Sequence, residues 1–250
     1  MRRLLAFALL GLSPALLVAQ EHPHAAPHWS YAGDTGPRHW GDLESDYAAC
    51  KTGKHQSPID IRKPERAGLP TLDFEYHDVP LTIVNNGHTI QVNYAAGSFV
   101  RIEGHRYQLV QFHFHHPSEE KVDGRAYDMV AHLVHKDAEG HLAVVAVLLT
   151  KGQANPLVQT LWDHLPGQVG HEDTVANLRV NAAGLLPKHL GYFEFEGSLT
   201  TPPCTEGVRW MVMREPTAIS PSEIATFGKL YHDNARPTQP SNGRAVKEST

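Results

Sequence analysis

Residues 107–115 read YQLVQFHFH, a run in which histidines alternate with phenylalanines. On a β-strand, side chains two residues apart share one face. Gln111, His113 and His115 therefore share a face, while Phe112 and Phe114 share the other. The stretch predicts a strand that presents two histidines from one side.

Outward from this stretch, the chain consists mainly of short strand-like runs separated by Gly, Pro, Asn or Asp. The runs are residues 81–84, 89–94, 99–102, 107–115, 129–135, 142–149, 192–195 and 208–213. Two helices are expected, one from Asn155-Pro156 to about His164 and one after the capping box at residues 220–223. Because regular helical crossovers are missing between the runs, we predict a mainly β domain over residues 28–250, with an antiparallel or mixed sheet and peripheral helices.

The composition is that of a globular protein, with 250 residues, 41% hydrophobic and 20% charged. The formal net charge of −5 offers no basic field for nucleic acid or an anionic membrane. The 18 histidines make metal binding or proton handling a class of function to look for.

The N-terminus has the pattern of a secretory signal peptide. Arg2 and Arg3 precede an apolar run of about 15 residues, which is short of the ~20 needed to span a bilayer. We expect residues 1–20 to be the signal, with cleavage between Ala19 and Ala26, and no membrane span afterwards. The mature protein would be periplasmic or secreted, where Cys50 and Cys204 are expected to form a disulfide rather than two buried thiols.

A third histidine can complete a metal site with His113 and His115. The run at residues 129–135, MVAHLVH, offers His132 and His135, which face opposite ways because they are three positions apart. His132 shares its face with valines, where an unpaired imidazole would be costly, whereas His135 lies beside Lys136 and is expected to face solvent. We favour His132. Three imidazoles leave one position open on zinc, which is typical of a catalytic site.

Further motifs then show that the sequence resembles the alpha-class carbonic anhydrases, in particular their exported bacterial branch, over residues 29–244. The resemblance rests on Gly36–Trp40, Gln56–Ile61, Asn85–His88, Gln111–His115, His132–His135, Ser198–Pro203 and Arg236–Pro240. It implies a large, mostly antiparallel, twisted central sheet and the reversible hydration of carbon dioxide to bicarbonate and a proton. Carbon dioxide, bicarbonate and water would be its partners, and the chain would be a monomer or a homodimer.

The resemblance also implies a role for individual residues. His113, His115 and His132 match the zinc ligands, and Gln111 matches the partner of His113. Thr200 and Glu119 match the pair that orients zinc-bound hydroxide, and His88 matches the histidine that shuttles protons. The positions that match the family's carbon dioxide wall and bicarbonate contact are Val134, Val144, Leu199, Thr200, Thr201, Val208 and Trp210.

One position departs from the family pattern. The family usually has a glutamate two residues before the third zinc histidine, and this chain has Val130 there. A backbone carbonyl, a water or another side chain would have to orient His132 instead. Our hypothesis is that the substitute is imperfect, so that zinc dissociates faster than with a carboxylate at position 130.

Two other classes of function fit parts of the sequence. His113, His115 and Glu119 have the spacing of a cupin-type metal oxygenase or isomerase, in which Glu119 would bind iron or manganese. The rest of the cupin pattern is missing. A carbonic-anhydrase-like binding module without catalysis is the other alternative, but such a module is expected to lack zinc histidines.

Overall fold

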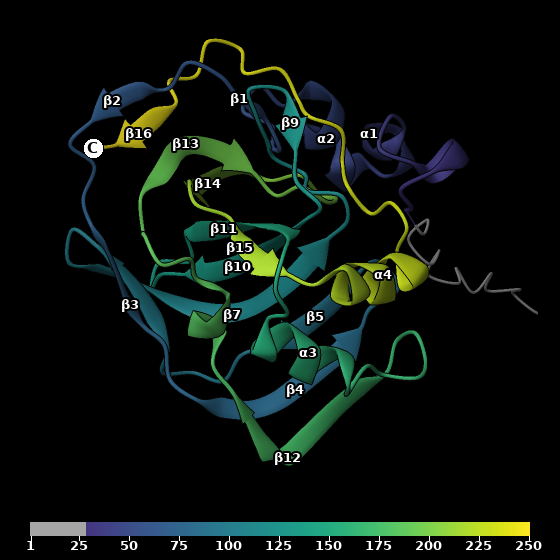
Figure 1. The fold of residues 1–250 in the computed structure, drawn as a ribbon. Helices are drawn as coiled ribbons and strands as arrows, with labels where there is room; N and C mark the ends of the chain where they lie inside the picture. The colour runs from purple at the N-terminus through teal and green to yellow at the C-terminus, as the bar shows by residue number, and fades with distance from the viewer. Residues whose placement is uncertain (1–28) are drawn as a thin grey trace, which may run out of the picture.

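Thirteen strands join one twisted sheet in the computed structural model, which describes residues 29–250 (Figure 1). The predicted signal peptide and its cleavage region lie outside these residues. The strands are β1 (Asp60–Ile61), β2 (Glu65–Ala67), β3 (Leu72–Glu75), β4 (Val79–Asn85), β5 (Ile90–Asn93), β6 (Phe99–Ile102), β7 (His105–His115), β8 (Lys121–Val122), β9 (Arg125–Ala126), β10 (Met129–Lys136), β11 (Leu142–Lys151), β12 (Glu172–Val180), β13 (Tyr192–Ser198), β14 (Glu206–Met213), β15 (Thr217–Ile219) and β16 (Lys247–Ser249).

The helical segments are short and lie outside the sheet. They are η1 (Gly33–Thr35), α1 (Trp40–Leu43), η2 (Ser45–Tyr47), α2 (Ala49–Thr52), α3 (Pro156–Trp162), η3 (Ala182–Leu185) and α4 (Pro221–Leu230). Among residues 29–250, no helix is long and apolar enough to cross a membrane.

The main sheet runs in the order β12-β4-β5-β7-β10-β11-β14-β13-β16-β2, and β3, β6 and β15 pair beside this path. Most neighbours are antiparallel, while β11 is parallel to β14 and β15, and β16 is parallel to β2. Three further short strands form a second sheet in the order β1-β8-β9. The prediction of a large, mostly antiparallel, twisted sheet is confirmed.

All eight strand-like runs are strands, and the two helices begin where the sequence predicts. At α3, the Asn155 side chain accepts from the amides of Leu157 and Val158. At α4, Ser220 and Glu223 form the expected capping box. Glu223 also accepts from the Asn155 amide, so the two helix starts are tied together.

The two faces of the sheet carry different cores. Phe112 and Phe114 on β7 and Leu133 on β10 belong to the larger apolar cluster, which α3 and α4 cover with residues such as Leu161 and Phe227. The smaller cluster, on the other face, contains Val130, Val134, Val144, Val208 and Trp210. The alternation along β7 and β10 therefore directs the histidines towards the smaller cluster.

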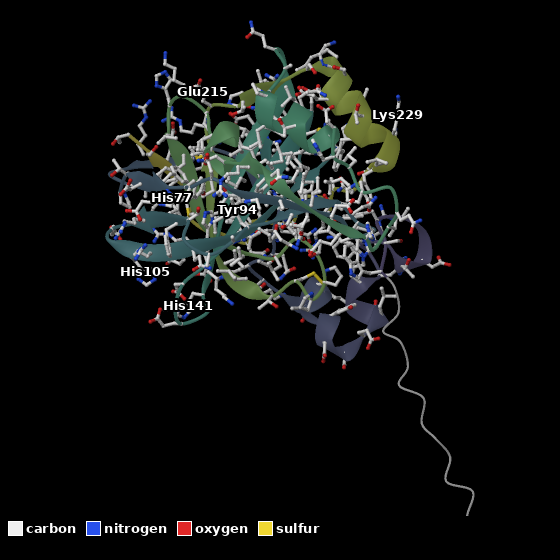
Figure 2. All side chains as sticks on the ribbon, turned by 90° about the horizontal axis from the view of Figure 1, so that it is seen from below. His77, Tyr94, His105, His141, Glu215 and Lys229 are labelled. Carbon is white, nitrogen blue, oxygen red and sulfur yellow. A yellow bond between two sulfur atoms is a disulfide. The ribbon has the colours of Figure 1, made fainter. Side chains whose placement is uncertain are left out.

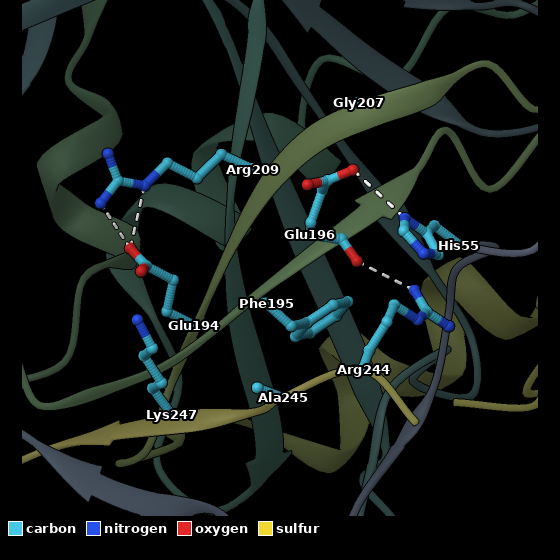
Figure 3. Close-up of a pocket in the computed structure, with 9 residues that line it drawn as sticks. All are labelled: His55, Glu194, Phe195, Glu196, Gly207, Arg209, Arg244, Ala245 and Lys247. Carbon is cyan, nitrogen blue, oxygen red and sulfur yellow. Dashed lines mark hydrogen bonds and ion pairs between the residues drawn. The ribbon is translucent and has the colours of Figure 1, made fainter. Parts of the chain in front are cut away.

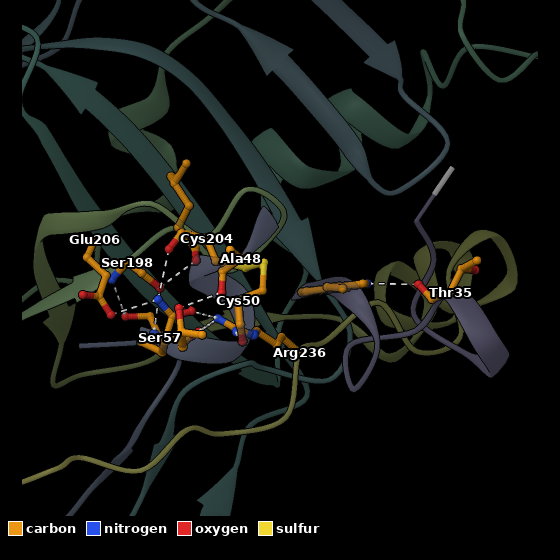
Figure 4. Close-up of a disulfide and its surroundings, with 12 residues drawn as sticks. Thr35, Ala48, Cys50, Ser57, Ser198, Cys204, Glu206 and Arg236 are labelled. Carbon is orange, nitrogen blue, oxygen red and sulfur yellow. Dashed lines mark hydrogen bonds between the residues drawn. A yellow bond between two sulfur atoms is a disulfide. The ribbon is translucent and has the colours of Figure 1, made fainter. Parts of the chain in front are cut away.

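Cys50 and Cys204 form a disulfide, which joins the N-terminal α2 to the loop between β13 and β14 (Figure 4). The same loop is tied to the Gln56–Ile61 segment because the Ser57 amide donates to the Ser198 hydroxyl (2.9 Å) and the Ser198 amide donates to the Ser57 hydroxyl (3.1 Å). Gly197 allows this approach, since a Cβ there would collide with the Ser57 hydroxyl.

Candidate metal centre

His113, His115 and His132 come together on one face of neighbouring strands. His113 and His115 extend from β7, and His132 lies directly opposite His113 in the antiparallel pairing of β7 with β10. Each histidine offers one ring nitrogen to a common point, and these nitrogens all lie within 4.8 Å of one another. The site thus unites the three predicted ligands.

The other ring nitrogen of each histidine already has a partner. His113 Nδ1 lies 2.8 Å from Gln111 Oε1, and His115 Nδ1 lies 2.7 Å from the carbonyl oxygen of Asn234. His132 Nε2 lies 3.2 Å from the Glu120 carboxylate. Because these acceptors hold a ring N–H, they leave His113 Nε2, His115 Nε2 and His132 Nδ1 as lone-pair donors.

Burial keeps two of the imidazoles neutral. Burial and the neighbouring His132 lower the pKa of His113 to about 3. Burial, His132 and His113 lower the pKa of His115 well below its ordinary value. Burial is the largest single influence on His132 and acts to lower its pKa, but the Glu120 and Glu119 carboxylates together outweigh it and raise the pKa. Neutral imidazole is the form that binds a metal.

The expectation that His135 faces solvent is wrong. Strand β10 continues one residue further, and His135 is fully buried on the opposite side of the sheet from His132. Its Nε2 pairs with the Tyr76 hydroxyl at 2.7 Å. The neighbouring Lys136 suggests exposure in the sequence, but the loop after β3 brings Tyr76 over this position.

Glu119 is a buried carboxylate beside the triad. Its Oε2 lies 3.5 Å from His115 Nε2 and 3.8 Å from His132 Nδ1, and its Oε1 accepts from the Arg236 amide at 2.7 Å. Burial raises the pKa of Glu119 to about 7, while His132 acts to lower it, as do hydrogen bonds from the Thr200 hydroxyl and the Arg236 amide. Glu119 and Thr200, which the sequence pairs by resemblance, therefore adjoin in the structure.

Arg236 was not among the predicted site residues, yet it supports Glu119. Its guanidinium is buried and donates to the carbonyl oxygens of Ser57 (2.7 Å) and Cys50 (3.1 Å), next to the disulfide (Figure 4). The Arg236-Pro237 motif is visible in the sequence. The hydrogen bond to Glu119, however, comes from the backbone amide of Arg236, and no side-chain type in the sequence indicates it.

The predicted apolar wall is assembled on the same face as the triad. The smaller cluster contains Val134, Val144, Val208 and Trp210, and Leu199 packs against it. The Trp210 ring lies 5.0 Å from the His132 ring, centroid to centroid, and its Nε1 donates to the Ser198 carbonyl. Thr201, also predicted here, is half-buried in the adjoining loop, where its carbonyl accepts from the Cys204 amide.

His88 lies in the turn between β4 and β5, stacked on Trp29 with ring centroids 3.6 Å apart. Asn234 connects this turn to the triad, because its side chain donates to the His88 carbonyl and its own carbonyl accepts from His115.

Trp29 also contacts the ring of Tyr31. Burial and the charge of Glu119 raise the pKa of Tyr31 well above its ordinary value. Sequence reasoning missed Trp29, Tyr31 and Asn234; the aromatic spacing of the first two is their only sequence signal.

A second cluster of metal-binding residue types, formed by His105, Asp137 and Glu139, lies at the tips of two hairpins. His105 and His141 project from the molecule there (Figure 2). Both rings pair with Asp137 Oδ2, at 3.0 and 2.9 Å. Asp137 Oδ1 accepts from the amides of Glu139 and His141. The carboxylate is thus saturated by hydrogen bonds that close the hairpin.

A hollow of about 640 Å³ lies beside β13 and β14, and none of the triad histidines lines it (Figure 3). Its charged groups are largely paired with one another. Arg209 donates to Glu194, His55 pairs with Glu196, and Arg244 donates to the Glu196 carbonyl. This hollow carries no reactive arrangement comparable with the triad.

The fold and the site together define a β-sheet protein with a three-histidine metal centre. A family model described as eukaryotic-type carbonic anhydrase matches residues 35–250. A carbonic anhydrase of Nostoc sp. is 40% identical over 252 residues, 99% of this chain and 96% of that protein. One of Klebsiella pneumoniae is 45% identical over 229 residues, 89% of this chain and 92% of that protein.

Among solved structures, a hyperthermostable carbonic anhydrase identified from an active hydrothermal vent chimney has a TM-score of 0.86 and 46% identity. The match covers 89% of this chain and 100% of that chain. The chain belongs to the eukaryotic-type carbonic anhydrase family and is an enzyme of that family.

Proposed function

We propose that this chain catalyses the reversible hydration of carbon dioxide to bicarbonate and a proton at a zinc ion held by His113, His115 and His132. The observation that carries the proposal is the orientation of the triad. Three imidazoles, of which His115 and His132 are buried and His113 is half-buried, direct one nitrogen each to a common point, while Gln111, Asn234 and Glu120 hold the other nitrogens.

The residues fit zinc rather than a harder cation. His115 Nε2 is buried and has no hydrogen-bond partner in the described structure, so a metal would satisfy it. An all-nitrogen donor set suits zinc, and three protein ligands leave a position for water. Zinc acidifies the water it binds, to a pKa of about 7 in carbonic anhydrase itself, which is the reference example of this effect.

The smaller apolar cluster supplies a binding surface for carbon dioxide. Carbon dioxide is uncharged and apolar, so it needs exclusion of water beside the metal rather than a counter-charge. Val134, Val144, Leu199, Val208 and Trp210 provide such a wall next to the triad.

Thr200 and Glu119 would orient the nucleophile. When Glu119 is ionised, its carboxylate only accepts hydrogen bonds, so the Thr200 hydroxyl would donate to it while the Arg236 amide holds the other oxygen. The Thr200 oxygen would then be left to accept a hydrogen bond from the nucleophile that the metal would supply, which would direct a lone pair of that nucleophile at the carbon atom of carbon dioxide. Thr201 would contact bicarbonate from the same loop.

His88 would carry the released proton to solvent. It is half-buried in the turn that Asn234 ties to His115, and its ring stacks on Trp29. An imidazole can accept a proton at one ring nitrogen and release one from the other, which suits it to pass protons to water.

Neither alternative class fits as well. In a cupin-type enzyme Glu119 would be a ligand, but the group that could hold a metal here consists of His113, His115 and His132 without Glu119. The Glu119 carboxylate accepts instead from the Arg236 amide, and the family that matches the chain is a different one. A non-catalytic module would not need three oriented histidines.

We also propose that the chain is exported. The signal-like N-terminus and the disulfide support this proposal.

The test compares a ligand variant with a neighbouring histidine. His132→Ala should lose bound zinc and carbon dioxide hydration together, because it removes one of three protein ligands. His116→Ala is the matched control, since His116 follows His115 directly but pairs through Nδ1 with the His232 carbonyl. Full zinc content and activity in folded His132→Ala would refute the site.

A further inference from the structure

Glu120 is a buried carboxylate with one polar partner. Its side chain is fully buried, and both of its oxygens lie 3.2 Å from His132 Nε2. Among residues 29–250, it makes no other side-chain hydrogen bond or ion pair, and Oε1 has no hydrogen-bond partner. The carboxylate therefore serves the His132 ring and no other group in the described structure.

The backbone around Glu120 is firmly anchored, which places the carboxylate. The Ser118 hydroxyl donates to the Glu120 carbonyl at 2.8 Å and accepts from the Tyr127 amide at 2.8 Å. On the other side, the Lys121 amide donates to the Ile59 carbonyl where β8 pairs with β1. Hydrogen bonds at the Glu120 carbonyl and at the following amide, where the small sheet β1-β8-β9 begins, thus fix the backbone of Glu120.

The position that the family resemblance marks for an acid cannot perform this task. Val130 is fully buried, on the same face of β10 as His132, in the smaller apolar cluster with Ile59 and Ile61. A valine side chain accepts no hydrogen bond. Of the substitutes that the sequence leaves open, the structure contains another side chain, and it is a complete carboxylate.

We propose that Glu120 is the positioning residue of the third metal ligand: it holds the ring N–H of His132 and thereby directs His132 Nδ1 to the metal. In this chain the supporting acid lies in the segment that precedes β8 and not on strand β10. This inference rests on the zinc site proposed above and contradicts our hypothesis that Val130 leaves His132 poorly supported.

The single partner of Glu120 favours a role at the metal site over a purely stabilising one. A buried carboxylate costs desolvation, and the one side chain that Glu120 contacts among residues 29–250 is a proposed metal ligand. A metal cation bound through the other nitrogen of the same ring would compensate its charge. Partners of this kind fix the tautomer and raise the basicity of the ligand, and their loss typically costs about 10–100-fold in metal affinity.

The experiment measures zinc dissociation from the purified protein into excess chelator. Glu120→Gln keeps the size and one acceptor but removes the charge, and Glu120→Val removes both. We expect dissociation about 10-fold faster in the first and closer to 100-fold faster in the second. In the double variant Glu120→Val/Val130→Glu the carboxylate returns to β10, and slow dissociation should be largely restored.

Glu223→Gln is the control for loss of a buried carboxylate. Glu223 is also buried, but it caps α4 and contacts none of the three histidines. It should lower the free energy of unfolding and leave zinc dissociation unchanged. The visible spectrum of the cobalt-substituted protein should change in the Glu120 single variants and not in the control.

The outcomes separate this inference from the proposed function. Wild-type protein that neither contains nor takes up zinc refutes both. Zinc-binding wild type with unchanged dissociation in folded Glu120 variants refutes only the role of Glu120. If the single variants do not fold, the double variant decides. A folded double variant that retains zinc supports the proposal. A folded double variant that loses zinc as fast as a variant lacking a histidine ligand overturns it.

Discussion

His135 should make the protein less stable in mild acid. Burial lowers the pKa of this histidine from 6.5 to about 3 in the folded protein. In the unfolded chain it protonates near 6.5, so the unfolded state binds the extra proton between these two values. Neutral His135 therefore makes its full contribution to the free energy of unfolding above pH 6.5. This contribution is lost as the pH falls, and the loss ends below about pH 3.

The size of the effect follows from the same two pKa values. Each pH unit below 6.5 costs about 1.4 kcal/mol, so that about 2 kcal/mol is lost between pH 8 and pH 5. His135→Gln removes the titrating group and keeps an amide that can pair with the Tyr76 hydroxyl. We expect the variant to be less stable at pH 8, but to lose about 2 kcal/mol less than the wild type on going to pH 5.

Denaturant unfolding at both pH values measures this difference. Contributions from the metal ligands are common to both proteins and cancel. His189→Gln is the control, because its side chain is 77% exposed and pays little desolvation cost. An equal loss of stability in the wild type and in His135→Gln would show that His135 is not held neutral by burial.

Three further predictions concern the disulfide and the proposed catalytic groups. Replacing Cys50 and Cys204 by serine opens a loop closed across 154 positions, and should cost up to about 5 kcal/mol in denaturant unfolding; unchanged stability would contradict this. Thr200→Val and Glu119→Gln should each reduce hydration activity strongly, and the double variant little further, since the residues act as a unit. Additive losses would show independent roles. His88→Ala should lower kcat with kcat/KM nearly unchanged, and imidazole buffer should restore part of it; a parallel fall without rescue would exclude the shuttle.

The long strands and the metal ligands were predictable because both depend on local periodicity. Strands β7 and β10 keep a regular register from Val134 back to Val130 and shift only between Val134 and His135, so the faces of His113, His115 and His132 follow from the sequence. Strand β12 was missed because it is polar and mostly exposed, without the apolar alternation of an interior strand. Strands β1 and β8 are two residues each and exist through their pairing.

The supporting groups of the site were not predictable for a different reason. Asn234 and Arg236 act through a backbone carbonyl and a backbone amide, which every residue possesses. Glu120 reaches His132 only because β8 pairs with β1, a contact between distant segments. His135 was misjudged because Tyr76, 59 positions away, covers it.

Stopped-flow measurement of carbon dioxide hydration, before and after removal of the metal, tests whether His113, His115 and His132 hold a zinc ion that hydrates carbon dioxide. We expect activity in the purified protein, its loss on chelation, and its return with about one zinc per chain. Hydration that persists in protein shown to be free of metal, or metal-replete folded protein that does not hydrate carbon dioxide, would contradict this expectation.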